Sequence, residues 1–206
     1  MNTESKLSKQ QLKSNATKDK IFCAAETILK KKGYEALSIK NICELAGVSN
    51  GSFYHHFQTK DDLLSYYIEH LPTVNATMLE VPGSLENVIH TIIEVYLNYA
   101  HYCEELGVEF LSNYYVPHNE ALNPTLRTQR SYPIVTVQHY LEKAIETKVV
   151  TTELSISEIT TDIRMLVIGN VFEWCIHKGN TDFAENIQRS IGHYLHAILA
   201  SPTDME

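Results

Sequence analysis

Small polar side chains, a phenol and two imidazoles follow one another in the segment from Ser49 to His56. Hydroxyl, amide and imidazole groups donate and accept hydrogen bonds. At the start of a helix they lie beside unpaired backbone N–H groups, which attract phosphate. Such a surface is suited to close contact with a phosphate backbone and with base edges. The segment is therefore a candidate nucleic-acid-binding surface.

The first of two short helices that position this surface is expected to begin after Ser38, a residue suited to N-capping. Its apolar residues recur at i, i+3, i+4 and i+7, which indicates one buried face. They are Ile39, Ile42, Cys43 and Ala46. Gly47 should end this helix, because glycine adopts the left-handed conformation at low cost.

The second helix, roughly Asn50 to Phe57, carries the polar surface itself. The Ser49 hydroxyl is its expected N-cap. Phe53 and Phe57 share one face, so the polar residues remain on the other. Two short helices joined at a glycine predict a helix-turn-helix.

The run A-G-V-S-x-G-x-F-Y-x-H-F-x-x-K-x-x-L, from Ala46 to Leu63, resembles the N-terminal DNA-binding signature of the TetR family of transcriptional repressors. This signature is specific, because it fixes a turn glycine, a capping serine, an aromatic pair, a histidine and a lysine at set spacings. Cys43 departs from the family's usual alanine, and a small thiol fits the same volume. The resemblance is strong from Thr17 to about Leu64 and continues beyond only in the number and length of helices.

The resemblance implies roles for ten residues in binding double-stranded DNA. Those expected to anchor phosphates are Ser38, Ser49, Tyr54, His56 and Lys60. Those expected to meet base edges are Lys40, Asn50, Gly51, Ser52 and His55. In the family the C-terminal helices form a four-helix bundle between two subunits. A two-fold homodimer would present two such surfaces to a palindromic operator.

Charge is divided unevenly along the 206 residues, whose net charge is −8. Residues 1–60 hold ten Lys and Arg against five Asp and Glu, whereas residues 61–206 hold seven against twenty. The basic part contains the helix-turn-helix, and the acidic part would repel DNA from other surfaces. Because no apolar run approaches membrane-spanning length and no signal peptide is recognisable, we expect a cytoplasmic protein without a membrane partner.

The sequence predicts an all-α fold of about nine helices in three segments. Residues 1–16 are a flexible arm, interpreted as a solvated tail or as an arm that touches DNA. Residues 17–60 form a three-helix DNA-binding domain whose first helix runs from Thr17 to Lys32. Residues 61–206 form a larger helical domain for ligand binding and dimerisation.

Apolar periodicity and capping residues place the helices of this larger domain. The expected helices are Thr59–Leu71, Leu85–Cys103, Glu105–Tyr115, Ile134–Lys148, Ile159–Lys178 and Phe183–Ile198. Ser84 should cap the second of them, and Thr59 with Asp62 and Ser155 with Glu158 should form capping boxes. The segment 114–133 contains three prolines and is expected to be mostly loop.

The helix expected over Ile159–Lys178 is apolar on two sides. One side can join the core of its own domain, and the other needs a partner. We therefore expect a homodimer built from this helix and the final one. The expected interface residues are Phe172, Ile176, Ile187, Ile191, Tyr194, Leu195 and Ile198.

Polar and aromatic side chains of the larger domain suggest a small-molecule pocket. Tyr96 and Tyr99, and likewise Asn170 and Trp174, are spaced to share a helix face. The expected pocket residues are Tyr96, Tyr99, Tyr114, Tyr115, His118, Asn170 and Trp174. An aromatic or lipid-like effector would suit them, and amphipathic aromatics at helix joins are the alternative.

No motif for catalysis, nucleotide phosphate binding or zinc binding is present, so we expect no enzymatic activity and no cofactor. The four cysteines are widely spaced and expected to be reduced. Outside the recognition helix, six histidines are expected to have no i, i+4 partner and no H-E-x-x-H pattern, which favours surface or core-edge histidines over metal ligands. These six are His101, His118, His139, His177, His193 and His196.

A second function remains open, that of an all-α ligand-binding protein or enzyme whose helix-turn-helix is only a helical corner. Such a corner would bury Tyr54 and His56, whereas a DNA-binding surface leaves them exposed. The operator, the effector and the direction of its effect are not determined by the sequence.

Overall fold

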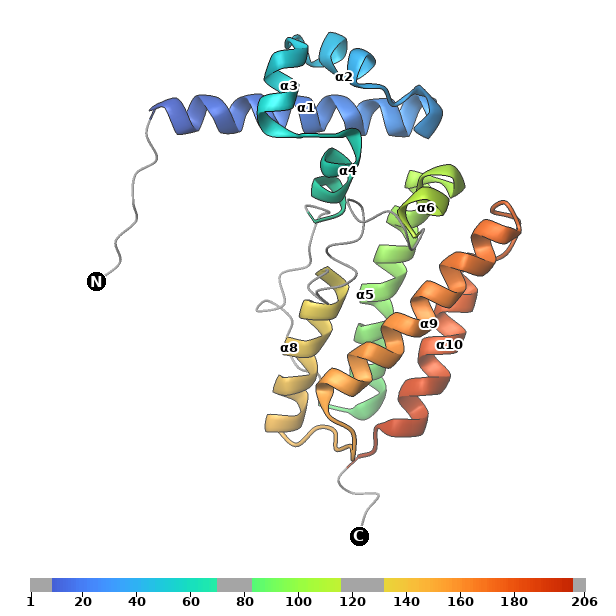
Figure 1. Cartoon of the computed structure of the whole chain (residues 1–206). Helices are drawn as coiled ribbons and strands as arrows, with labels where there is room; N and C mark the ends of the chain where they lie inside the picture. Colours follow the sequence, from blue (N-terminus) through green and yellow to red (C-terminus); the bar gives the residue numbers. More distant parts are fainter. Residues whose placement is uncertain (1–8, 70–82, 116–131, 202–206) are drawn as a thin grey trace. The chain divides into compact units, whose positions relative to one another are not determined.

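Helices form all the regular secondary structure in the residues that the computed structural model describes, which are 9–69, 83–115 and 132–201 (Figure 1). Within these residues there are nine α-helices and one short 3-10 helix, and the predicted all-α fold is confirmed. A single isolated bridge joins Thr151 to Ala200. None of the described helices is both long and apolar enough to cross a membrane.

The chain consists of two units, Met1–Tyr67 and Ile68–Glu206, and the boundary falls within a helix. The first unit contains α1 (Lys9–Lys32), η1 (Tyr34–Ala36), α2 (Ile39–Ala46), α3 (Asn50–His56) and most of α4 (Lys60–Glu69). The second contains α5 (Leu85–Leu106), α6 (Val108–Tyr114), α8 (Tyr132–Glu146), α9 (Ile156–Ile176) and α10 (Phe183–Ile198). The roles expected for residues 1–16, 17–60 and 61–206, those of an arm, a DNA-binding domain and a ligand-binding and dimerisation domain, stay predictions.

The predicted start of the first helix at Thr17 is wrong, because α1 already begins at Lys9. The added stretch contains lysine, glutamine and leucine and has neither glycine nor proline, so a helix nucleated on the core can continue through it. Part of the expected flexible arm is therefore helical. Residues 1–8 lie outside the described residues.

The core of the first unit joins α1 to the two short helices, which both contact it. Buried apolar side chains come from the four α-helices of the unit and from two residues that end helices, Leu37 and Phe57: Ile21, Ala24, Ala25, Ile28, Leu29, Leu37, Ile42, Cys43, Phe53, Phe57, Leu63 and Leu64. The capping box of α4 is present, since the Asp62 amide donates to Thr59 Oγ1 at 3.0 Å and the Thr59 amide donates to Asp62 Oδ2 at 3.2 Å. Pro72 lies outside the described residues.

The helices of the second unit agree with the predicted ones to within a few residues. Gly107 separates α5 from α6, so α5 is longer and α6 shorter than expected. Pro133 lies in the first turn of α8, where its missing N–H costs no hydrogen bond. Most of the predicted loop 114–133 lies outside the described residues.

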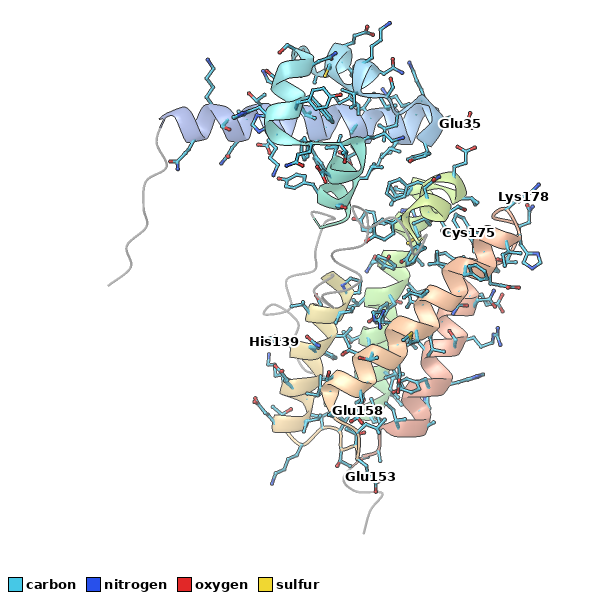
Figure 2. The ribbon with its side chains drawn as sticks, viewed as in Figure 1. Glu35, His139, Glu153, Glu158, Cys175 and Lys178 are labelled. Carbon is cyan, nitrogen blue, oxygen red and sulfur yellow. The ribbon has the colours of Figure 1, made fainter. Side chains whose placement is uncertain are left out.

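Helices α5, α8, α9 and α10 lie alongside one another and enclose the core of the second unit (Figure 1). Their side chains fill the space between the ribbons (Figure 2). Ser84 caps α5 and Ser155 caps α9 as predicted, and the Ser155–Glu158 capping box is present. At the far end of α9, the Trp174 ring stacks on Phe183 with centroids 5.4 Å apart.

Three of the residues expected at a dimer interface are instead in the core of their own protomer. Ile187, Ile191 and Leu195 are fully buried on the side of α10 that packs against α5 and α9. The final helix has one apolar stripe, and its own unit uses it. Tyr194 is half-buried and its hydroxyl donates to Asp162 at 2.6 Å, and Ile198 is also half-buried.

The other two expected interface residues, both on α9, do remain exposed. Phe172 is 63% exposed and Ile176 is 56% exposed. Met165, which lies seven residues before Phe172 and thus two helical turns closer to the start of α9, is 57% exposed. Thus α9 buries one side in its unit and leaves an apolar stripe on the other.

Candidate nucleic-acid interface

Local hydrogen bonds fix the start of α2 and the position of the residues around it. Ser38 Oγ accepts from the Asn41 amide at 3.2 Å, which makes Ser38 the N-cap as predicted. The Asn41 side-chain amide also donates to the Ala36 carbonyl at 2.8 Å. Lys40 is exposed in this first turn, where its ammonium is free to reach a polyanion.

The turn between α2 and α3 depends on backbone conformation. Gly47 has φ 65° and ψ 39°, the left-handed region that favours glycine. A Cβ there would meet no atom within 4 Å, so it is the conformation and not the available space that requires glycine. The Val48 amide donates to the Cys43 carbonyl at 3.0 Å and closes the turn. Ser49 Oγ then accepts from the Ser52 amide at 3.1 Å and caps α3.

Two buried phenylalanines hold α3 on the unit and direct its polar face outward. Phe53 and Phe57 are buried, with ring centroids 5.8 Å apart. On the other side Asn50, Gly51 and His55 are exposed, Ser52 is partly exposed, and Tyr54 is 54% exposed. The structure thus brings together the expected residues of α3 on one accessible surface.

The two residues chosen to separate the alternative functions are not buried. The exposure of Tyr54 is that expected of a binding surface. His56 is partly exposed, and its ring centroid lies 5.0 Å from that of His55. Burial, and to a lesser extent the charges of His55 and Lys18, lowers the pKa of His56. A neutral imidazole can both donate and accept a hydrogen bond.

An open groove of about 990 Å³ lies between the first half of α1 and α3. Its lining residues are Gln11, Lys13, Ser14, Thr17, Ser49, Gly51, Ser52, His55 and His56. The contribution of α1 was missed in the sequence, because Gln11 to Ser14 were interpreted as an irregular arm. The helix-forming residues from Lys9 to Lys13, with no glycine or proline between them and Thr17, were the signal that could have shown it.

The last expected contact residue, Lys60, stands at the first position of α4. Its Nζ lies 4.1 Å from the centroid of the Tyr34 ring. This cation–π contact restricts the ammonium group without neutralising its charge. Lys60 therefore remains available to a phosphate.

The sequence and the fold of the chain were compared with those of known proteins. The sequence profile described as bacterial regulatory proteins, tetR family, matches residues 21–67. Residues 21–67 therefore form an N-terminal domain of the TetR type. The match covers the core of the first unit, including the whole helix-turn-helix.

Two relatives are similar to part of the chain. The uncharacterized HTH-type transcriptional regulator YwcC of Bacillus subtilis is 39% identical over 64 residues, which are 31% of this chain and 29% of YwcC. The TetC protein of transposon Tn10 from Escherichia coli is 35% identical over 94 residues, 44% of this chain and 47% of TetC. The chain thus spans less than half the length of each relative.

A solved TetR-family structure resembles nearly the whole chain in fold. The repressor FadR of Thermus thermophilus, in complex with lauroyl-CoA, superposes with a TM-score of 0.60 at 14% identity. The superposition covers 87% of this chain and 93% of FadR. At this identity the likeness concerns the fold of the TetR family alone.

The pocket that was expected in the second unit is only partly assembled. Tyr96, Tyr99 and Tyr115 line one small cavity, and Tyr114 is buried beside them, its ring 5.1 Å from that of Tyr115. His118 lies outside the described residues.

The two α9 residues expected in that pocket lie elsewhere. The Asn170 amide donates to the Leu166 carbonyl at 2.8 Å and to Ser190 Oγ at 3.0 Å, and Trp174 stacks on Phe183. Both therefore face α10. The expectation was wrong because a shared helix face does not determine which neighbour that face meets.

Histidines outside the helix-turn-helix contact glutamates one helical turn away. The expectation that they lack i, i+4 partners is wrong for His101, which lies 3.4 Å from Glu105, and for His177, which lies 3.1 Å from Glu173. All four groups lie at the surface, where such pairs contribute little to stability.

Proposed function

We propose that this chain is a cytoplasmic transcriptional regulator that binds a palindromic DNA operator as a homodimer. In this proposal it represses until a small-molecule effector releases it. The observation that carries the DNA-binding part is the accessible polar surface of α3, held by Phe53 and Phe57 and bordered by the groove against α1. No catalytic step is part of the proposal.

The residues of this surface divide into two kinds of contact. Lys60 and the capping hydroxyls suit phosphates, which set affinity and its salt dependence. Asn50, Gly51 and Ser52 stand at the start of α3, where recognition helices meet base edges. An exposed asparagine can bind adenine through two hydrogen bonds, worth about 1–3 kcal/mol of discrimination.

A direct test selects bound sequences from a random duplex pool and measures their affinity for variants. Lys60→Ala should weaken all sequences alike and reduce the salt slope by about 0.9. Asn50→Ala should relax the preference at one or two positions. Lys31→Ala, at the far end of α1, is the matched control and should change neither. Failure of the wild type to enrich any sequence would refute the proposed function, and equal losses across sequences for both variants would refute the division of roles.

The dimer is supported by the apolar stripe of α9. Met165, Phe172 and Ile176 are exposed large hydrophobic residues, and the exposed Gly169 lies between them. Successive spacings of four, three and four residues place them in one line along the helix. A glycine in such a line allows the partner helix to approach closely. The occupant that we propose for this stripe is the same stripe of a second copy.

The effector is proposed to bind within the second unit, among α5, α6, α8 and α9. The cavity lined by Tyr96, Tyr99 and Tyr115 supports this placement. A ligand-bound relative of the same fold, FadR with lauroyl-CoA, is consistent with the expected aromatic or lipid-like effector. Binding is expected to weaken operator affinity without competition for the DNA surface.

A further inference from the structure

A small, partly open cavity in the second unit lies among residues of four helices. Its volume is about 20 Å³, enough for roughly one water molecule. Its lining residues come from α5, the end of α6, α8 and α9: Tyr96, Tyr99, Tyr115, Pro133, Ile134, Arg164, Val167 and Ile168. This lining contains hydrogen-bond donors and apolar groups but no acidic side chain.

The phenols of the cavity include an unsatisfied donor. Tyr96 is only 2% exposed and its hydroxyl has no hydrogen-bond partner. The hydroxyls of Tyr99 and Tyr115 lie 2.7 Å apart and share a hydrogen bond. Burial raises the pKa of all three tyrosines, so each keeps its proton at neutral pH. A buried donor without an acceptor is costly, so an acceptor that entered this space would gain a hydrogen bond from Tyr96.

Arg164 supplies a positive charge to the same cavity. Its Nε is buried without an acceptor, and no carboxylate of the described residues lies within ion-pair distance of its guanidinium. The residue as a whole is partly exposed, so it stands at the edge of the cavity. A guanidinium offers five N–H donors and matches a planar carboxylate through two parallel hydrogen bonds.

We infer that this cavity binds the acidic group of a small organic acid, with Arg164 and Tyr96 holding the carboxylate. The apolar walls formed by Ile134, Val167 and Ile168 contact the hydrocarbon part next to that group. The inference rests on the proposed effector-binding role of the second unit. It adds to that role the chemical class of the ligand and the residues that select it.

Entry of a ligand requires movement of Tyr115. This residue also lines a second, open cavity of about 290 Å³, whose other walls are Leu111, Ser112, Val171, Cys175 and the exposed α9 residues Phe172 and Ile176. Because Tyr115 is common to both linings, rotation of its ring away from Tyr99 would join the two spaces. The carboxylate would then lie at Arg164 while the apolar remainder extends toward Leu111. Ligand binding is thereby coupled to the end of α6.

Thermal unfolding of the full-length protein without DNA tests this inference. The probes are hexanoate, decanoate and benzoate at millimolar concentration, each beside its neutral primary amide, with sodium chloride at equal ionic strength. At least one carboxylate should raise the midpoint temperature more than its amide does, since a ligand of the native state stabilises by mass action. Calorimetry should show about 10- to 100-fold weaker binding to Arg164→Gln, with partial recovery in Arg164→Lys.

Two tyrosine variants separate a ligand contact from a structural role. Tyr96→Phe should be as stable as the wild type or more stable without ligand, because it removes an unsatisfied hydroxyl, yet it should bind the carboxylate several-fold more weakly. Tyr140→Phe alters an equally buried tyrosine outside the cavity and should leave binding unchanged. Equal stabilisation by acid and amide for every pair, no stabilisation by any probe, or wild-type binding by Arg164→Gln and Tyr96→Phe would overturn the inference. None of these outcomes depends on whether the protein binds DNA.

Discussion

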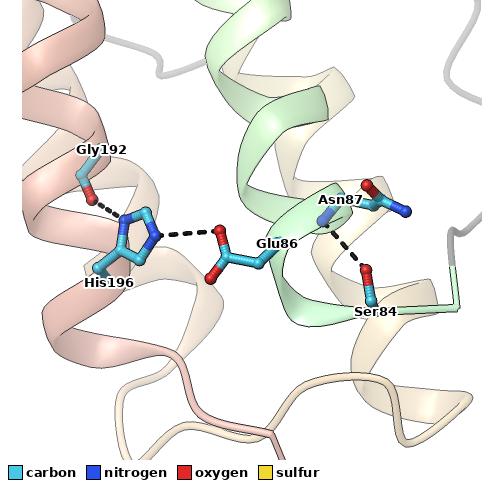
Figure 3. Close-up of polar contacts among 5 residues, drawn as sticks. All are labelled: Ser84, Glu86, Asn87, Gly192 and His196. Atoms are coloured by element: carbon cyan, nitrogen blue, oxygen red, sulfur yellow. Dashed lines mark hydrogen bonds and ion pairs between the residues drawn. The ribbon is translucent and has the colours of Figure 1, made fainter.

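His196 connects the last helix of the second unit to the beginning of α5. Its Nε2 lies 3.3 Å from Glu86 Oε2, and its Nδ1 lies 2.8 Å from the Gly192 carbonyl (Figure 3). The hydrogen bond to Gly192 and then that to Glu86 raise the pKa of His196. Both acceptors favour the protonated imidazolium, which can donate from both nitrogens.

The stability of the second unit should therefore depend on pH through His196. A folded pKa above the unfolded value means that the stabilisation is fully present below about pH 6.5 and is lost as pH rises through the folded pKa. Because the pair is exposed, the effect should stay below about 1 kcal/mol. Urea unfolding at about pH 5.5 and about pH 8.5 should show this loss in the wild type but not in His196→Gln. His193→Gln, an exposed neighbour on α10, is the control, and an unchanged pH dependence in His196→Gln would contradict the assignment.

Two glycines of the helix-turn-helix should respond oppositely to alanine. Gly47→Ala should destabilise the first unit by about 1 kcal/mol, because an L-residue is strained at its positive φ. Gly51→Ala should preserve or raise stability, since Gly51 is helical and a Cβ meets only Ser49 Oγ at 3.7 Å. It should nevertheless weaken DNA binding if bases approach this backbone closely. Chemical denaturation of both variants measures stability, and operator titration measures DNA binding. If Gly51→Ala binds the operator with wild-type affinity, Gly51 does not contact DNA.

At the scale of helices, the sequence predicted what is decided locally. Ser38, Ser49 and Ser155 cap the helices that they were expected to cap, because each bond spans only three residues. The α3 surface was predictable for the same reason: the turn glycine and the two phenylalanines determine which side faces outward.

Local sequence does not determine which neighbour a helix face packs against, so the predictions for the α10 interface and for the α9 pocket residues failed. The stripe of α10 that includes Ile191 could serve its own core or a second subunit, and the period of the pattern is the same for both. Likewise Asn170 and Trp174 face α10 whereas Arg164 and Val167 face the cavity. Arg164 did leave a signal, since it is the only lysine or arginine between residues 149 and 177.

The exposed stripe of α9 provides a cleaner test of dimerisation than α10. Phe172→Asp should yield a folded monomer, because Phe172 contributes little to its own core and a buried charge would oppose pairing. Val135→Asp, on the exposed side of α8, is a matched control and should remain dimeric. Sedimentation gives the oligomeric state and circular dichroism the fold. A wild type that sediments as a monomer at micromolar concentration would refute the dimer. Ile191→Glu cannot serve here, since it would place a charge in the protomer core.

At the scale of the whole molecule, the two proposed activities reside in different units of the chain. The DNA surface belongs to the first unit and the candidate ligand cavity to the second, and α4 contains the boundary between them. In a dimer, two DNA surfaces must match half-sites about one helical turn apart, roughly 34–36 Å. Affinity for the operator therefore depends on the distance between the two DNA surfaces of the dimer.

A carboxylate that binds the second unit should weaken operator binding. It can do so only by its differential affinity for the two arrangements of the dimer, and a coupling of about 1–3 kcal/mol corresponds to a 5- to 150-fold loss of operator affinity. By reciprocity, operator DNA should weaken carboxylate binding by the same factor. Titration of labelled operator at increasing concentrations of the tightest-binding probe measures the first effect, and calorimetry with and without operator measures the second. Arg164→Gln should bind the operator normally and remain bound when the probe is added, because it keeps the DNA surface and loses the ligand anchor. If the wild type binds the probe yet keeps its full operator affinity at saturation, the second unit does not control the first.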